Sequence, residues 1–449
     1  MIPIRALRDC LDGAIPGVVS TWGPDGMPNV AYMSQGHYLD RRHLALSYQF
    51  FNRTRQNILA NPRVLLGLIH PQTAQQYRVH LTYQRTETEG PVFEAMKAKL
   101  AGIASHTGMS EVFRLRGSDI YRIERVEGVP GTALPMPEPA VDTLSALRAC
   151  MARLPLSPDA ESLLDALLDG LLDHFAIEQA LVMMLDPVRA RLYTVASRGY
   201  ATSGVGSEIP VGHGVIGVAA REGVPIRISH MTSEYAYGLA MREGAERQGL
   251  GALLETEIPF PGLPAPGSQL AVPIPGVREP LGVLFVESPT EMRFFHADED
   301  ALAALAIQVG ALFRLFLAEL ELGEEPPAAM EGHPPPSGAL MQIRHYAAND
   351  SIFLGDDYLI KGVAGNILWT LLQDHHTQGR VHFSNRELRA DPRVRLPDQS
   401  DNLEARLVLL HRRLAERQAC VQLEKTGRGR FRLAVDRPLE LVDVEGAGI

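Results

Sequence analysis

The chain lacks the paired cysteines that would hold a small domain together or bind a metal cluster. Its 449 residues include three cysteines, Cys10, Cys150 and Cys420, which lie far apart with no C-x-x-C spacing. A disulfide framework, a four-cysteine zinc site and a four-cysteine iron–sulfur cluster are therefore not expected. The longest apolar run, residues 301–313, contains Gln308 and is shorter than the ~20 residues that span a bilayer. With no signal-peptide stretch in the first twenty residues, we expect a cytoplasmic protein without membrane contact.

The chain also lacks the composition of a disordered or fibrous protein. Hydrophobic residues make up 45% and charged residues 21%, which is ordinary globular usage. The length exceeds what one hydrophobic core organises and predicts two to four domains. Two proline-rich stretches, 128–141 and 323–338, are expected to be linkers. They divide the chain into domains at 1–130, 141–322 and 338–440.

The net charge of −10 is unevenly distributed. Residues 1–131 carry a balance of +4, residues 132–374 carry −17, and residues 375–437 carry +6. A basic segment joined to an acidic body indicates a polyanionic partner. A solvated basic surface without a partner is the alternative.

The first domain shows short β-type runs separated by turn signals. Residues 17–22 and 28–33 flank a Gly-Pro-Asp-Gly turn and predict a hairpin, and 43–47, 64–69 and 77–86 predict further strands. A small antiparallel β barrel is the expected fold.

Two segments of this domain, Ala45-Leu-Ser-Tyr-Gln-Phe-Phe-Asn-Arg-Thr-Arg-Gln-Asn57 and Ala60-Asn-Pro-Arg-Val64, resemble the FMN-binding split barrels of the pyridoxamine phosphate oxidase type. The resemblance implies a homodimer with FMN at its interface. The residues that it assigns to the flavin phosphate are Ser47, Gln49, Asn52, Arg53, Thr54 and Arg55. Hydroxyl, amide and guanidinium donors suit a phosphate dianion. The family usually carries Lys or Arg where Thr54 stands, so Arg53 or Arg55 would supply the charge. A polar turn on a barrel without a ligand is the alternative.

No acid–base pair for turnover is visible in the first domain, because its histidines are scattered along the sequence. The sequence supports cofactor binding better than catalysis. A flavin-dependent oxidase or reductase with appended regulatory domains is therefore kept as the second functional hypothesis.

The second domain alternates helical and β-type patterns. Leucines at helical spacing over 163–172 and an apolar run over 296–320 predict helices around several strands, an α+β arrangement. Residues 210–225, 268–274 and 281–286 resemble GAF sensory domains. The glycine-rich turn at the start of the first of these segments is not followed by the Lys-Ser/Thr of a phosphate-binding loop, so we interpret it as structural.

The resemblance to GAF domains implies a ligand pocket between the sheet and a covering segment, here about residues 230–254. Its candidate ligand-binding residues are His230, Tyr235, Tyr237 and Met241. Aromatic and thioether side chains could wrap a planar or apolar small-molecule effector, or they could simply close the core. The identity of the ligand does not follow from the sequence.

The third domain begins with short strands over 340–360 and continues with helices over 362–372, 385–390 and 400–414. Ser384 is expected to cap the second helix, and Asp401 with Glu404 to form a capping box on the third. A basic hairpin follows. Strands, three helices and a hairpin predict a winged helix, and their order resembles the DNA-binding effector domains of two-component response regulators.

The arginine-rich face of this domain is predicted to contact double-stranded DNA. The resemblance implies that Arg406, Arg412 and Arg413 lie on the recognition helix and reach the major groove or its flanking phosphates. The hairpin side chains would reach the minor groove or the backbone; they are Lys425, Arg428, Arg430 and Arg432. A docking surface for a protein is the alternative.

The sequence as a whole predicts a multidomain protein with an antiparallel β split barrel, an α+β GAF domain and a winged helix. We interpret it as a cytoplasmic, ligand- or redox-responsive transcription regulator, in which the first two domains control DNA binding by the third.

Overall fold

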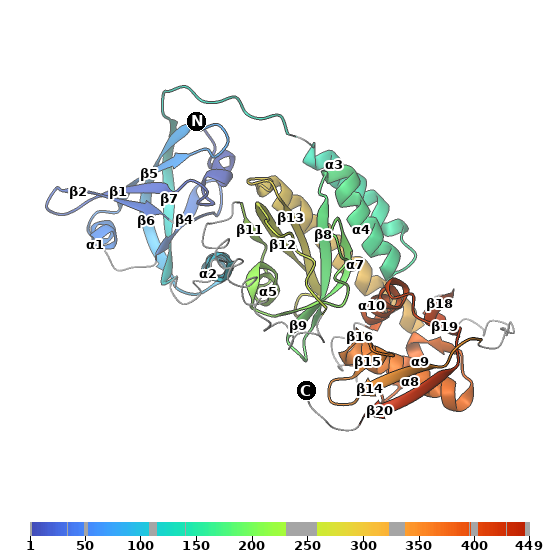
Figure 1. Ribbon diagram of the computed structural model, residues 1–449. Coiled ribbons are helices and arrows are strands. Elements are labelled where there is room, and N and C mark those ends of the chain that lie inside the picture. The colour runs from blue at the N-terminus through green and yellow to red at the C-terminus, as the bar shows by residue number, and fades with distance from the viewer. Residues whose placement is uncertain are drawn as a thin grey trace.

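The structure is a computed structural model with three units in chain order (Figure 1). The residues that it describes are 2–33, 35–48, 53–106, 115–139, 141–229, 258–322, 337–394, 396, 403–427 and 429–444, without the side chains of 101–106 and 317–322.

The first unit is built on one seven-stranded antiparallel sheet of order β2-β1-β5-β6-β7-β4-β3. Its strands are β1 Gly17–Trp22, β2 Pro28–Met33, β3 Gly36–Tyr38, β4 His43–Tyr48, β5 Arg63–Ile69, β6 Gln76–Glu87 and β7 Gly117–Gly128. The strands expected from alternation are present, and β1 pairs with β2 from Gly17 opposite Met33 to Trp22 opposite Pro28. Alternate side chains of β1 and β5 are buried, so one face of the sheet surrounds the core of the unit.

Three helical segments accompany this sheet: η1 Ile4–Cys10, α1 Arg53–Ala60 and α2 Pro91–His106. η1 buries Ile4, Leu7 and Cys10 in the core of the first unit. α2 instead packs against the second unit, where its Ala98 joins a cluster of that unit's side chains.

The second unit has a six-stranded sheet of order β10-β9-β8-β13-β12-β11. Its strands are β8 Gln179–Asp186, β9 Arg191–Arg198, β10 Glu208–Pro210, β11 Ile226–Ile228, β12 Ser268–Ile274 and β13 Gly282–Ser288. Every residue of β12 is buried, because helices cover both faces of the sheet.

The helices of the second unit are α3 Thr143–Arg153, α4 Ala160–Phe175, α5 Gly214–Glu222 and α7 His296–Leu322, with a short 3-10 turn, η2, at Leu154–Leu156. α3, α4 and α7 lie on one face of the sheet and α5 on the other (Figure 1). The Asp159 side chain caps α4 by accepting from the Ser162 amide. Most of the predicted leucine stripe is buried, as an amphipathic helix requires.

The third unit combines two small sheets with three helices. The first sheet has the order β16-β15-β14-β20 and the second the order β17-β19-β18. The elements are β14 Met341–Tyr346, β15 Ser351–Leu354, β16 Asp357–Ile360, α8 Gly362–Gln378, β17 His382–Ser384, α9 Asn385–Ala390, α10 Leu403–Glu416, β18 Val421–Gly427, β19 Arg430–Val435 and β20 Leu439–Val444. Ser384 caps α9 in a full capping box with Glu387, which confirms that prediction.

The hydrophobic cores show how the three units are joined. The first unit has a core of its own, but a single cluster runs from α3, α4 and the sheet of the second unit into α8 and α10 of the third unit. The second and third units are therefore one packed body at this contact. Residues 130–139 form an exposed segment between β7 and α3 (Figure 1). No helix in the described part of the chain is long and apolar enough to cross a bilayer.

Candidate functional site

The helix to which the sequence assigns DNA recognition, α10, lies against the GAF domain. It contacts α4 and β9, and each of its residues from Leu403 to Leu414 is buried or half-buried. We call this contact the α10 junction.

Arg406 is the most deeply held basic residue of the α10 junction. Its Nη2 donates to Asp186 Oδ2 at 2.6 Å, and both side chains are almost inaccessible, at 8% and 4% exposure. The guanidinium also stacks over the Tyr193 ring, 3.8 Å from its centroid. In this state Arg406 faces the GAF domain and is closed off from any external partner.

Glu161, in the first turn of α4, accepts from two basic groups of the third unit. Its Oε1 lies 2.9 Å from His411 Nδ1, and its Oε2 lies 2.8 Å from Lys425 Nζ. Lys425 also donates to Asp159 at 2.9 Å. Burial alone would raise the pKa of Glu161, but the hydrogen bonds from His411 and Lys425 hold it at about 2. Glu161 is thus a fixed anion over the physiological range.

Arg412 continues this row of ion pairs along α4. Its Nη2 donates to Asp165 at 2.9 Å, and its Nε lies 3.5 Å from Glu161 Oε1. Further along α10, Glu416 accepts from the Ser203 hydroxyl at 2.7 Å. Basic side chains of the third unit therefore meet carboxylates of the second along the α4 edge of the contact.

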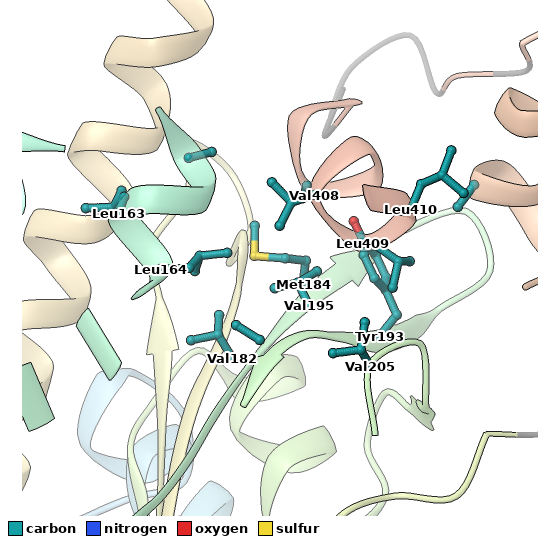
Figure 2. Packing of buried hydrophobic residues seen from close by; sticks show 14 of the residues in the cluster. Leu163, Leu164, Val182, Met184, Tyr193, Val195, Val205, Val408, Leu409 and Leu410 are labelled. Carbon is teal, nitrogen blue, oxygen red and sulfur yellow. The ribbon is translucent and has the colours of Figure 1, made fainter. Parts of the chain in front are cut away.

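The centre of the α10 junction is apolar. Figure 2 shows Val408 and Leu409 close to Met184 and Tyr193 of the GAF sheet. All four side chains are at most 6% exposed. Since α10 buries apolar as well as charged groups, its contact with the GAF domain is packed and is not only electrostatic.

The remaining predicted DNA-binding residues are dispersed. Arg413 is buried at 4% exposure and donates to the Leu359 carbonyl and to Glu416 within its own unit. Burial lowers its pKa. Arg432 is paired with Glu424 on the neighbouring strand. Arg430 begins β19 and is half-buried, and Arg428 lies outside the described residues. The structure therefore does not gather the six described residues of this set on one open face.

The described residues of the set predicted for the flavin phosphate already have partners within this chain. Arg55 donates to Asp119 at 2.7 Å and to Thr86 at 2.6 Å, and it packs between the rings of Tyr48 and Tyr83. Burial raises the pKa of Asp119 despite its hydrogen bonds with Thr86 and Arg55.

The other two described turn residues also have protein partners. The Thr54 hydroxyl accepts from Asn29, and Arg53 pairs with Asp25. Ser47 lies on β4, and Gln49 and Asn52 lie outside the described residues. Because the carboxylates of Asp119 and Asp25 already balance the two arginines, the described residues do not form a cradle for a phosphate dianion.

The predicted GAF ligand residues His230, Tyr235, Tyr237 and Met241 lie outside the described residues. Within the described part, Glu287 is buried on the sheet and accepts from the Leu263 amide at 2.8 Å and from Gln269 at 3.1 Å. Burial raises the pKa of Glu287. No sequence pattern indicated this buried polar group, since a single Glu near the end of an otherwise apolar strand is expected to face solvent.

The first unit meets the GAF domain through the packing of α2 and through an ionic contact, and we call the two together the barrel junction. Arg227 of β11 donates to Asp12 at 2.6 Å and to Glu299 at 3.0 Å, and its side chain is 4% exposed. Burial alone would raise the pKa of Glu299, but Lys99 and Arg227 hold it at about 2. Asp9 bonds His296 across the same contact at 2.8 Å.

Three groups at the barrel junction could by distance hold a metal ion: Asp9, Asp12 and His296. The guanidinium of Arg227 already occupies this cluster, 3.0 Å from the His296 ring and 2.6 Å from Asp12. A fixed cation at that position opposes a second one, so the cluster fits an interdomain ion network better than a metal site.

The carboxylates that pair with the basic residues of α10 and with Lys425 of β18 are the residues of this contact that the sequence did not indicate. They are Asp159, Glu161, Asp165 and Asp186. A signal was available in the charge distribution, because the −17 segment and the +6 segment can neutralise each other within one chain. Only the packing shows which carboxylate meets which cation.

Comparison with known families identifies the first two units. Residues 4–123 match the family model described as pyridoxamine 5'-phosphate oxidase, and residues 157–314 match the GAF domain model. The chain therefore contains a pyridoxamine-phosphate-oxidase-like barrel domain followed by a GAF domain. No curated protein matches it.

Three solved structures illustrate these similarities. The GAF domain of an Acinetobacter phosphoenolpyruvate-protein phosphotransferase is 20% identical, with TM-score 0.31, covering 39% of this chain and 94% of its own. HupZ from Group A Streptococcus is 22% identical, with TM-score 0.24, covering 30% and 99%. An FMN-binding protein from Syntrophomonas wolfei is 16% identical, with TM-score 0.24, covering 28% and 88%.

Proposed function

We propose that this protein is a cytoplasmic, ligand-responsive DNA-binding regulator whose third unit is a winged helix held closed by the GAF domain. The observation that carries the proposal is the row of ion pairs at the α10 junction. Basic groups assigned to DNA, including Arg406, Arg412 and Lys425, each meet a GAF-domain carboxylate. The carboxylates supply the negative charge that phosphates would supply on DNA.

The order of elements supports the winged-helix assignment. Strands β14–β16 precede α8, α9 and α10, and the hairpin β18–β19 follows as the wing. In this arrangement α10 is the recognition helix, and DNA binding requires that it leave the GAF domain. An effector that binds the GAF domain would act by changing the balance of closed and open states.

A homodimer is part of the proposal, since winged helices commonly read paired half-sites. The edge strand β2 supports it, because Val30 and Tyr32 expose 66% and 83% of their surface there. Pairing of two barrels at this edge would cover both side chains.

Gel retardation of duplex DNA at about 50 mM salt tests the proposal, since low salt favours phosphate contacts. The double variant Glu161→Gln, Asp165→Asn removes two carboxylates from the α10 junction and should bind DNA more tightly than the unchanged chain. Asp173→Asn is the matched control, because Asp173 also lies on α4 and pairs with Arg153, away from α10.

Adding Arg412→Ala to the opened double variant should weaken DNA binding again and flatten its salt dependence by about one unit, as expected for one lost phosphate contact. Absence of retardation in both the unchanged and the opened chain would contradict the proposal and favour the alternative that this surface only docks protein.

Flavin binding by the barrel is the second candidate function, favoured by the family match of residues 4–123. The test is the flavin absorbance of the purified chain, before and after addition of FMN and removal of free cofactor. A chain that stays colourless in both cases removes the flavin oxidase or reductase hypothesis. A yellow chain would require that Arg53 or Arg55 exchange its carboxylate for the phosphate.

A further inference from the structure

A cavity of about 620 Å³ lies between the GAF domain and the third unit. One wall comes from the start of α4 and from Leu312, Leu315 and Phe316 of α7. The other comes from α10, including Leu407, and from the hairpin β18–β19, including Phe431. Its volume is in the range of small-molecule sites, which often lie between domains.

The charged side chains around the cavity already have partners within the chain. Lys425 is neutralised by Asp159 and Glu161, and His411 bonds to Glu161. On the other side, Glu404 accepts from Asn385 and from Arg389 at 3.1 Å and 2.9 Å. A charged ligand would have to break one of these pairs, whereas an uncharged apolar ligand would bury its surface against the leucine and phenylalanine side chains.

We infer that this cavity is a binding site for an uncharged, mostly apolar small molecule, and that the bound molecule holds α10 on the GAF domain. The second part rests on the proposed function. It follows from the walls of the cavity: each domain supplies only part of the lining, so the complete site exists only when α10 is docked. A ligand that binds one state alone favours that state.

The expected size of the effect follows from linkage. At a free ligand concentration of 100 times its Kd, the ratio of closed to open chains rises about 100-fold. The ligand would therefore oppose any partner that needs α10 exposed. This site is separate from the GAF sheet face that carries α5, because it lies on the side of α4 and α7.

The probe for the test is N-phenyl-1-naphthylamine, an uncharged apolar dye whose fluorescence rises in apolar surroundings. The full chain should bind it saturably, with one site per chain. Leu407→Trp, on α10, and Leu315→Trp, on α7, place an indole in the cavity from opposite walls and should each weaken binding about tenfold or more. Leu315 is 50% exposed, so its substitution should leave the fold intact.

Leu144→Trp is the matched control, because Leu144 is 74% exposed on α3 and does not line the cavity. It should bind the dye as the unchanged chain does. Absence of saturable binding by the unchanged chain, or equal binding by all three variants, overturns the site.

Hydrogen–deuterium exchange of α10 tests the direction of the effect without DNA. Saturating dye should slow exchange of the α10 amides, and Leu407→Trp should abolish that slowing. Unchanged or faster exchange overturns the claim that the ligand holds the closed state. Since neither readout uses DNA, the cavity site can succeed while DNA binding fails, and gel retardation with and without the dye separates the two.

Discussion

The GAF domain has two neighbours, and it holds them in different ways. The barrel junction is organised around Arg227, whose side chain is 4% exposed and contacts two carboxylates. The α10 junction has an apolar centre around Val408 and Leu409, one buried pair between Arg406 and Asp186, and an edge of half-exposed pairs.

This difference predicts different mobilities. Separating the barrel junction would leave several buried charges without partners, which is costly at every pH where they are ionised. Separating the α10 junction exposes its apolar centre and the buried pair of Arg406 and Asp186. The half-exposed edge pairs are hydrated again when they separate, so breaking them costs little free energy. We therefore expect the barrel junction to be harder to separate than the α10 junction, which the proposed function requires to open.

The largest effect is expected from Arg227→Met. It removes the cation between Asp12 and Glu299, and the buried Glu299 then loses its nearest partner. We expect a loss of about 3–5 kcal/mol in the free energy of unfolding, measured by urea denaturation. Arg221→Met is the control, since Arg221 is half-exposed and pairs with its neighbour Glu222. A loss below about 1 kcal/mol would mean that the barrel junction is no firmer than the edge of the α10 junction.

The next effect is expected from Asp186→Ala. Arg406 stays buried over Tyr193 but loses its carboxylate. This should weaken the α10 junction by about 3 kcal/mol, at the lower end for a broken buried pair. Exchange of the α10 amides should therefore speed up by about two orders of magnitude. Amides of α2 report on the opening of the barrel junction. If their exchange speeds up as much as that of the α10 amides, the two junctions open together and do not differ in mobility.

The sequence predicted the local structure of the third unit well because the signals there are local. The cap of α9 at Ser384 and the hairpin of β18 and β19 each follow from residues that are close together in the sequence. The expected capping box of Asp401 and Glu404 stays a prediction. Glu404 bonds Asn385 and Arg389 of α9, and Asp401 lies outside the described residues.

Contacts between distant segments could not be predicted. β20 pairs in parallel with β14, with Met341 opposite Leu439, and no local pattern announces such a partner. The same holds for α10: the sequence assigned its arginines to DNA, but it cannot distinguish a DNA phosphate from a carboxylate 220 residues away, such as Asp186. The charge of an arginine indicates that its partner is an anion, and only the packing determines which anion it meets.

A smaller effect is expected from Lys425→Met at the edge of the α10 junction. Lys425 is 50% exposed and pairs with Asp159 and Glu161. Exposed pairs contribute about 0.2–1 kcal/mol, so α10 exchange should speed up by less than about fivefold. Raising the salt concentration should speed up α10 exchange in the unchanged chain by a similarly small factor, because salt screens the edge pairs. The same change in salt should have a smaller effect on Lys425→Met, because only the other edge pairs remain to be screened. An effect as large as that of Asp186→Ala would show that the edge, and not the centre, holds the junction.

The smallest effect concerns β20, which lies at neither junction and so provides a reference for both. His345 of β14 is buried, stacks on Trp369, and bonds Asp443 of β20 at 2.9 Å and Asp350 at 3.2 Å. Burial alone would lower its pKa, but the hydrogen bonds to Asp350 and Asp443 raise it above 6.5. A raised pKa in the folded state means that the stabilisation is complete below pH 6.5 and is lost as the pH rises through the folded value.

Exchange of β20 amides, corrected for the intrinsic pH dependence, should therefore speed up above pH 6.5 while that of β13 does not. Asp443→Asn should remove most of this step, and a step of unchanged size would leave Asp350 as the group that holds the proton.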